Sequence, residues 1–316
     1  MRTRTTGMSR RTAWLVAAGM TAAFGLAGCG ADEGEDPFSS GGSGDGGGTI
    51  VVGSANFPES ELLMEMYAQA LEAKGVEVDT KPNIGAREVY MKAFEAGDIT
   101  LLPEYNGALL AYLSDGELPQ DVSTSEEVYE ALQEVLPEGA ETLPQSEAED
   151  KDTLTVSQET AEKYSLKTIE DLAPVAGELS LAAGPEFRER YQGLVGLKEL
   201  YGVEFGEFKP LDPGGPLTVG ALEDGTVDVA NVFSTDSAIE VNDWIVLEDT
   251  KNLFLAENVL PLIKSDAVTP EVEEALNGVS EALTTDNLTE ALAKVQVDKQ
   301  DPAVVAEEFL AEHGLD

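Results

Sequence analysis

The pattern of apolar and polar positions predicts an α/β unit in the first part of the chain. Three short apolar runs with β-favouring residues alternate with two stretches of helical periodicity. The expected strands are Ile50–Gly53, Val76–Pro82 and Ile99–Leu102, and the expected helices are Glu59–Ala73 and Arg87–Ala96. A strand–helix–strand–helix–strand order predicts a parallel sheet with helices covering its faces.

The same order returns about 130 residues later. The strands expected there are Leu179–Ala183, Val203–Phe208 and Val227–Val232, with a helical stretch up to Tyr201 and a helix at Leu217–Glu223. The sequence therefore predicts two βαβαβ units of similar organisation. A chain of 316 residues is long enough for two such units.

Two aromatic residues occupy matching places in the two units. Tyr105 follows the helix-ending Gly97 by eight residues, and Phe233 follows Gly225 by eight residues. Each therefore lies near the carboxyl end of a strand, where open parallel sheets bind ligands. Either ring alone is as well explained by ordinary packing, but the matched pair favours a ligand cleft between two lobes.

The N-terminus resembles an export signal with a lipid-attachment site. Four arginines precede an apolar stretch, Ala13–Ala27, that is short for a membrane span. It ends in LAGC, a match to the bacterial lipobox, in which Cys29 is acylated; a plain signal peptide with an accidental cysteine is the alternative. Residues 1–28 are thus expected to be a signal peptide, exported by the Sec or the twin-arginine route, and residues 29–48 a flexible acidic tether.

Charge and chemistry exclude several classes of function. With 61 acidic and 19 basic residues, a net charge of −42 repels nucleic acid and anionic lipid, although it also simply keeps an exposed protein soluble. The lone cysteine precludes an intramolecular disulfide, and the single histidine, His313, is close to the C-terminus. We find no triad, metal-ligand cluster or phosphate-binding loop, and we expect no enzyme, metal or cofactor.

Five segments, in order, resemble the glycine betaine/choline/carnitine substrate-binding family of ABC importers. They are GSANFPES (53–60), PEYNG (103–107), AEKYSLKTIEDL (161–172), AGPEF (183–187) and DVANVFSTD (228–236). The resemblance runs from about residue 50 to 265. It implies a type II periplasmic-binding-protein fold, with two lobes that are joined by a hinge and close on a ligand.

The resemblance also implies a set of ligand-binding residues. A trimethylammonium group has no N–H to donate, so aromatic faces select it through cation–π attraction. Tyr105 matches a cage tyrosine of the family, Phe233 matches another, and Arg190 matches an arginine that meets a ligand carboxylate; a surface salt bridge is the alternative for Arg190. Asn56, Asn106 and Thr235 are further candidates, and for Asn56 and Thr235 capping of turns or helices is the alternative.

This sequence departs from the family pattern at four positions. Two cage positions read Asp152 and Glu257, a common lysine is replaced by Ala55, and a common threonine by Ala108. If both acids face the cleft, they suit a ligand with N–H donors or a second positive charge, and glycine betaine binds weakly. The alternatives are a surface acid near the hinge for Asp152 and a solvated loop residue for Glu257.

Together these observations predict the organisation and function of the chain. Lobe 1 is expected at residues 49–152 plus 255–316 and lobe 2 at 153–254, with chain crossings near Asp152–Thr155 and Asp249–Leu255. The expected protein is a monomeric, lipid-anchored receptor on the outer face of the cytoplasmic membrane. It would bind a cationic or zwitterionic solute, such as betaine, choline, carnitine or another amine, for a permease and an ATPase. A secreted carboxylate-based hydrolase and a surface adhesion or sensor module are the alternatives.

Overall fold

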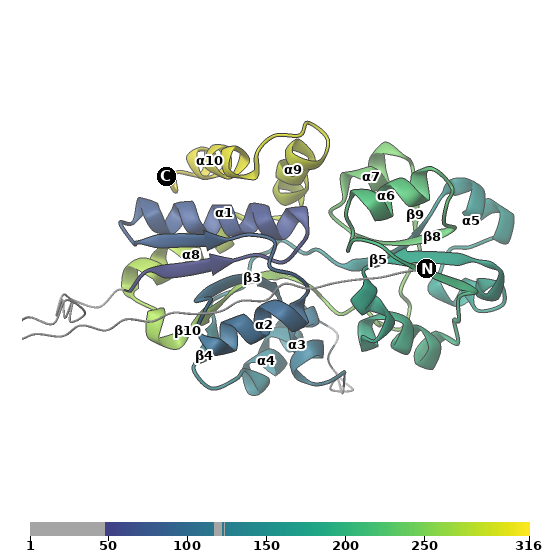
Figure 1. The fold of residues 1–316 in the computed structure, drawn as a ribbon, viewed down its shortest axis with the longest axis horizontal. Coiled ribbons are helices and arrows are strands. Elements are labelled where there is room, and N and C mark those ends of the chain that lie inside the picture. Colours follow the sequence, from purple (N-terminus) through teal and green to yellow (C-terminus); the bar gives the residue numbers. More distant parts are fainter. Residues whose placement is uncertain (1–47, 117–121, 123) are drawn as a thin grey trace, which may run out of the picture. The chain divides into compact units, whose positions relative to one another are not determined.

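The structure, a computed structural model, describes residues 48–116, 122 and 124–316 (Figure 1). The predicted signal peptide, the lipid-attachment residue Cys29 and nearly all of the predicted tether lie outside the described residues. Within the described residues, no helix is both long enough and apolar enough to span a bilayer.

The first sheet has the strand order β2-β1-β3-β10-β4. Its strands are β1 (Ile50–Gly53), β2 (Val78–Lys81), β3 (Leu101–Tyr105), β4 (Ala140–Thr142) and β10 (Val259–Lys264). Strand β1 is parallel to β2 and β3, whereas β10 is antiparallel to β3 and β4. The sheet is therefore mixed rather than wholly parallel, because a strand from the far end of the chain enters it in the opposite direction.

Helices cover both faces of this sheet. They are α1 (Pro58–Ala73), α2 (Arg87–Ala96), α3 (Asn106–Leu113), α4 (Ser125–Val135), α8 (Pro270–Ala282), α9 (Thr285–Gln296) and α10 (Pro302–His313). Leu101 and Ile263 share one apolar cluster with residues of α1, α8 and α10, whereas Leu102 and Leu262 pack with residues of α2 to α4. Since successive strand residues point to opposite faces, these are the cores on the two sides of the sheet.

Two prolines face each other in the middle of the first sheet. Pro103 of β3 pairs with Pro261 of β10 in the antiparallel register. In alternate pairs of such a ladder the backbone N–H and C=O groups point away from the partner strand, so a proline there removes no bond between the two strands. This register allows the first three residues of the PEYNG segment, Pro103 to Tyr105, to lie in a central strand.

The second sheet has the order β7-β6-β8-β5-β9. Its strands are β5 (Asp152–Val156), β6 (Ser180–Ala183), β7 (Glu207–Pro210), β8 (Val229–Phe233) and β9 (Ile245–Val246), and its helices are α5 (Gln158–Tyr164), α6 (Pro216–Glu223) and α7 (Ser237–Val241). Strand β6 is parallel to β7 and β8, and β5 is antiparallel to β8 and β9. Leu181 and Val229 belong to one apolar cluster and Ala182 and Ala230 to another, so this sheet too is buried on both faces.

The predicted element order is confirmed in both parts, although the strand expected at Val203–Phe208 is shifted to Glu207–Pro210. Two larger differences concern the chain crossing and a helix. Strand β5 starts at Asp152, so the chain passes from the first sheet to the second before the expected crossing at Asp152–Thr155. The predicted helical stretch up to Tyr201 is a 3₁₀ turn (Pro185–Arg188) and two wide turns (Tyr191–Val195 and Leu197–Tyr201). Further 3₁₀ turns lie at Ile169–Leu172, Ala176–Glu178 and Ser265–Ala267.

The second difference has a steric cause. Gln192 and Gly193 have non-helical backbone angles, and a Cβ on Gly193 would lie 2.1 Å from the carbonyl oxygen of Phe187. The backbone therefore folds closely onto the preceding turn, which only glycine permits. This bend breaks the expected helix immediately after Arg190.

Candidate ligand-binding site

A small pocket is lined by residues from both sheets and from the helices and loops that flank them. It contains a space of about 50 Å³, which is the room of a few water molecules. Its walls combine aromatic rings, carboxylates and two arginines. The pocket is thus built for a small, polar, charged ligand rather than for a lipid or a polymer.

Three aromatic rings form one wall. Phe57 precedes α1, Tyr105 ends β3 and Phe233 ends β8. The centroid of the Phe57 ring is 6.1 Å from that of Tyr105 and 5.0 Å from that of Phe233. The two rings expected from the sequence therefore line one pocket, and Phe57 lies between them.

The position of the Phe233 ring depends on Gly214. This glycine has a φ of +58°, and a Cβ there would lie 2.5 Å from the Phe233 ring. A residue with a side chain would be strained at this φ and would displace the ring. The backbone at Gly214 therefore fixes one edge of the aromatic wall.

Six of the eight ligand-binding residues expected from the sequence line the pocket: Asn56, Tyr105, Asp152, Arg190, Phe233 and Glu257. Asn106 and Thr235 are not among its lining residues. Ala55 and Ala108, the two small residues that depart from the family pattern, also line it. Asp152 and Glu257 are thus pocket residues in the structure.

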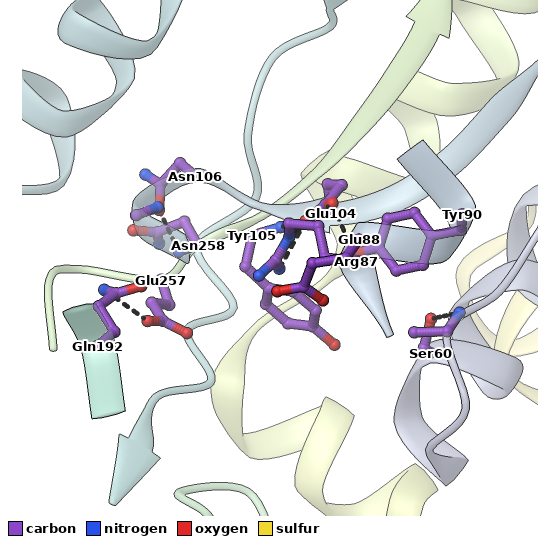
Figure 2. Close-up of polar contacts among 12 residues, drawn as sticks. Ser60, Arg87, Glu88, Tyr90, Glu104, Tyr105, Asn106, Gln192, Glu257 and Asn258 are labelled. Atoms are coloured by element: carbon purple, nitrogen blue, oxygen red, sulfur yellow. Dashed lines mark hydrogen bonds and ion pairs between the residues drawn. The ribbon is translucent and has the colours of Figure 1, made fainter. Parts of the chain in front are cut away.

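Asn106 and Thr235 support the walls from behind. The Asn106 side chain accepts from the backbone N–H groups of Gly107 and Asn258, both at 2.8 Å, and donates to Gln145 at 2.7 Å. It ties the start of α3 to the segment that carries Glu257 (Figure 2).

Thr235 is fully buried and donates its hydroxyl to Glu59 of α1 at 2.5 Å. Glu59 also accepts a hydrogen bond of 2.7 Å from the hydroxyl of Tyr105. The segment that follows β8 is therefore linked to a pocket ring through one buried carboxylate.

A buried ion pair lies at the centre of the site. Arg87 of α2 donates to Glu104 of β3 through Nε and Nη2, each at 2.9 Å (Figure 2). Glu104 also accepts from the Tyr90 hydroxyl at 2.6 Å and from the Tyr105 backbone N–H at 3.0 Å. The Glu104 side chain is inaccessible to solvent, and the network fixes the backbone from which the Tyr105 ring extends.

Arg190 forms the second arginine pair. Its Nε and Nη2 donate to the two carboxylate oxygens of Glu88, each at 2.9 Å. Burial acts to raise the pKa of Glu88, but the hydrogen bond and charge of Arg190 outweigh it and lower the pKa. This pair joins α2 of the first sheet to the segment that follows β6 of the second.

Four acids around the pocket have raised pKa values, mainly because burial disfavours the charged form. The pKa of Glu257 is well above its ordinary value, since burial and then the charge of Asp152 both act upward. Burial raises the pKa of Asp152 against the hydrogen bond from Asn231. Burial raises the pKa of Glu59 against hydrogen bonds that lower it, including one with Asp150, and burial followed by the charge of Glu59 raises the pKa of Asp150.

These shifts predict that the ligand-free protein is more stable at pH 5 than at pH 8. Groups with a raised folded pKa keep their protons in the folded state while the unfolded chain releases them, so their contribution to stability is lost as the pH rises. The pKa of Glu88 is lowered, so its pair with Arg190 weakens only below its ordinary value of 4.5. Thermal unfolding at constant ionic strength measures the trend.

The double variant Glu59→Gln with Asp150→Asn is the matched control. It removes two of the titrating groups and should flatten the dependence of the thermal midpoint on pH. A midpoint that falls steadily from pH 8 to pH 5 in the unmodified protein would contradict the assignment of raised pKa values.

Sequence reasoning missed several residues of the site. Phe57 carried a usable signal, because it lies four residues after the carboxyl end of β1 and precedes Pro58 at the start of a helix. Arg87 and Tyr90 carried no such signal, because both side chains are positioned by hydrogen bonds to Glu104 of β3, which the fold brings next to them. In the described residues no group of three metal-binding side chains is placed to hold a metal ion.

Each of the two mixed sheets has parallel βαβ strands and one antiparallel strand beside them, and residues from both sheets line a small charged pocket. This arrangement defines a solute-binding protein of the type II periplasmic-binding-protein fold. Residues 48–312 match the family model described as the substrate binding domain of the ABC-type glycine betaine transport system. The chain belongs to this family.

Relatives and solved structures agree with this family. A glycine-betaine-binding protein of Pseudomonas aeruginosa is 27% identical over 280 residues, which cover 84% of this chain and 88% of the relative. The carnitine transport binding protein OpuCC of Listeria monocytogenes is 26% identical over 83% of this chain and 86% of its own. A crystal structure titled as a glycine betaine/carnitine/choline ABC transporter aligns with a TM-score of 0.66 and 26% identity, over 84% of this chain and 99% of that one.

Proposed function

We propose that the protein captures a small organic cation or zwitterion, of the quaternary-ammonium class or a related amine, and presents it to an ABC permease. The observation that carries the proposal is the wall of three rings, Phe57, Tyr105 and Phe233, in a pocket that also contains carboxylates. Aromatic faces attract cations through the ring quadrupole, and surrounding acids add to that attraction. The relatives named for glycine betaine and carnitine support the same class of ligand.

Capture follows from contacts that join the two sheets across the pocket. Arg190 pairs with Glu88, and Thr235 donates to Glu59, so each contact links a segment of the second sheet to a helix of the first. We propose that residues 49–151 plus 255–316 and residues 152–254, the boundary following the start of β5, form two lobes that part and close, breaking and remaking these contacts. A ligand that binds the closed form better shifts the population toward it.

The proposal includes a place for the protein in the cell. The family is a transport family, so a permease and an ATPase are the expected partners. Acylation at Cys29 would hold the folded part on the outer face of the cytoplasmic membrane through residues 29–48, with the protein acting as a monomer. Mass spectrometry of membrane-extracted protein tests this, since a diacylglycerol adduct on Cys29 is expected and an unmodified cysteine contradicts it.

A ligand-panel melt tests the proposed function. Choline, glycine betaine, carnitine and their unmethylated counterparts are added in turn, and at least one should raise the thermal midpoint in a saturable way. Binding to the folded state alone stabilises it by about 2.7 kcal/mol at a ligand concentration of 100 times Kd. Each compound should be recovered chemically unchanged. If no compound shifts the midpoint at millimolar concentration, the proposal fails.

A further inference from the structure

The lining of the pocket is rich in acidic side chains. Asp150, Asp152, Glu186 and Glu257 all line the pocket. Only Arg87 and Arg190 bring positive charge to its lining, and each already makes a two-point ion pair with a carboxylate outside this group of four. The pocket therefore holds more carboxylates than its own arginines compensate.

Asp152 and Glu257 are two of these acids with little compensation. In the described part of the chain, neither takes part in an ion pair. Asp152 accepts one hydrogen bond on Oδ1, from Asn231 at 2.8 Å. Glu257 is 3% exposed and accepts one long hydrogen bond on Oε1, from Gln192 at 3.4 Å (Figure 2).

The second oxygen of each carboxyl group therefore lacks a donor from the described residues. A buried carboxylate is costly unless it is paired and hydrogen-bonded. Asp152 and Glu257 line the same pocket, and the charge of Asp152 acts to raise the pKa of Glu257. One cation can thus serve both groups.

The fold brings these acids to the aromatic wall. Asp152 begins β5 and pairs in register with Phe233 at the end of β8. Phe57 packs against Phe233 with ring centroids 5.0 Å apart. Asp152 and Phe233 therefore lie side by side, and a ligand in the pocket would meet aromatic rings and free carboxylate oxygens together.

Permethylated ammonium groups are suited to the aromatic rings but not to the two carboxyl groups. They have no N–H, so they cannot donate to Asp152 or Glu257, and their methyl groups hold the charge away from the oxygens. A primary ammonium, amidinium or guanidinium group donates to carboxylates through short, charge-assisted hydrogen bonds. It can still place its carbon chain or flat face against the rings.

We propose that the physiological ligand is a small organic cation with at least two N–H donors, bound by the carboxyl groups of Asp152 and Glu257 and by the rings of Phe57 and Phe233. This inference rests on the proposed function and narrows its class of ligand. Specificity in the site is thus set by hydrogen-bond donors rather than by methylation.

Calorimetric titration with matched pairs tests the inference. The pairs are ethanolamine and choline, glycine and glycine betaine, and γ-aminobutyrate and its trimethylated form, with 4-guanidinobutyrate as the guanidinium probe. The unmethylated member should bind at least about tenfold more tightly in the pairs that bind, because each charge-assisted hydrogen bond outweighs a methyl contact. Tighter binding of the trimethylated members would overturn the inference and leave the proposed function intact. No binding by any compound would contradict both.

Variants of the two acids supply a second readout. Asp152→Asn and Glu257→Gln keep the shape of each side chain and remove its charge. Each variant should bind the unmethylated compound at least about tenfold more weakly and should show a smaller difference in affinity between the unmethylated and methylated compounds. Glu204→Gln is the matched control, since Glu204 pairs with Lys198 on the exposed surface without lining the pocket, and it should change neither affinity. An unchanged preference in both acid variants would contradict the inference.

Discussion

Phe233→Ala is expected to weaken binding of the tightest ligand of the panel by at least about tenfold, because a desolvated ring–cation contact is worth about 2 kcal/mol. Phe233 closes the pocket from the second sheet and packs against Phe57 from the first, so its removal also loosens the neighbouring ring. Calorimetric titration of the variant measures the loss.

Phe208→Ala is the matched control for this substitution. Phe208 belongs to β7 of the same sheet, is also partly buried, and packs against Arg188 outside the pocket. The Phe208→Ala variant should be less stable than the unmodified protein but should bind the ligand with the same affinity. If Phe233→Ala retained wild-type affinity while folding normally, the aromatic wall would not be part of the binding site.

Arg87→Met is expected to lower the free energy of unfolding by about 3–5 kcal/mol, since removing one partner of a buried ion pair leaves an uncompensated charge. Glu104 would keep the Tyr90 hydroxyl and a backbone N–H as donors but would lose the only cation that contacts it among the described residues. Chemical denaturation measures the difference in stability.

Two comparisons separate charge from packing in this result. Lys198→Met removes the exposed pair with Glu204, whose side chains are 62% and 67% exposed, and should cost at most about 1 kcal/mol. Adding Glu104→Gln to Arg87→Met should recover part of the lost stability, because the stranded charge is gone. A cost for Arg87→Met as small as that for Lys198→Met would contradict the role of the pair in fixing β3.

Local sequence patterns were sufficient to predict most elements of the fold. Gly97 and Gly225 both adopt positive φ after a helix, at +83° and +66°, and the strands that follow end at Tyr105 and Phe233. The direction of β10 in the sheet was not predictable, since Val259–Lys264 is an apolar run with no local mark of its partner. The bend at Gly193 was also hidden, because it depends on contact with the preceding turn.

The candidate site was predictable where a residue follows a strand end and not where it depends on a partner distant in sequence. Tyr105 and Phe233 end strands, so pattern and resemblance together placed their rings in one cleft, whereas the sequence left open whether Asp152 faces it. Sequence did not reveal that Arg190 pairs with Glu88, 102 residues away. Nor did it show that Asn106 and Thr235 support the walls rather than line them.

The most direct test of the central claim is a crystal structure of the protein with its tightest-binding cation. We expect the cationic nitrogen to lie within about 6 Å of the ring centroid of Phe57, Tyr105 or Phe233, in the pocket that Asp152 and Glu257 also line. A ligand bound elsewhere on the molecule, with this pocket empty, would contradict the account.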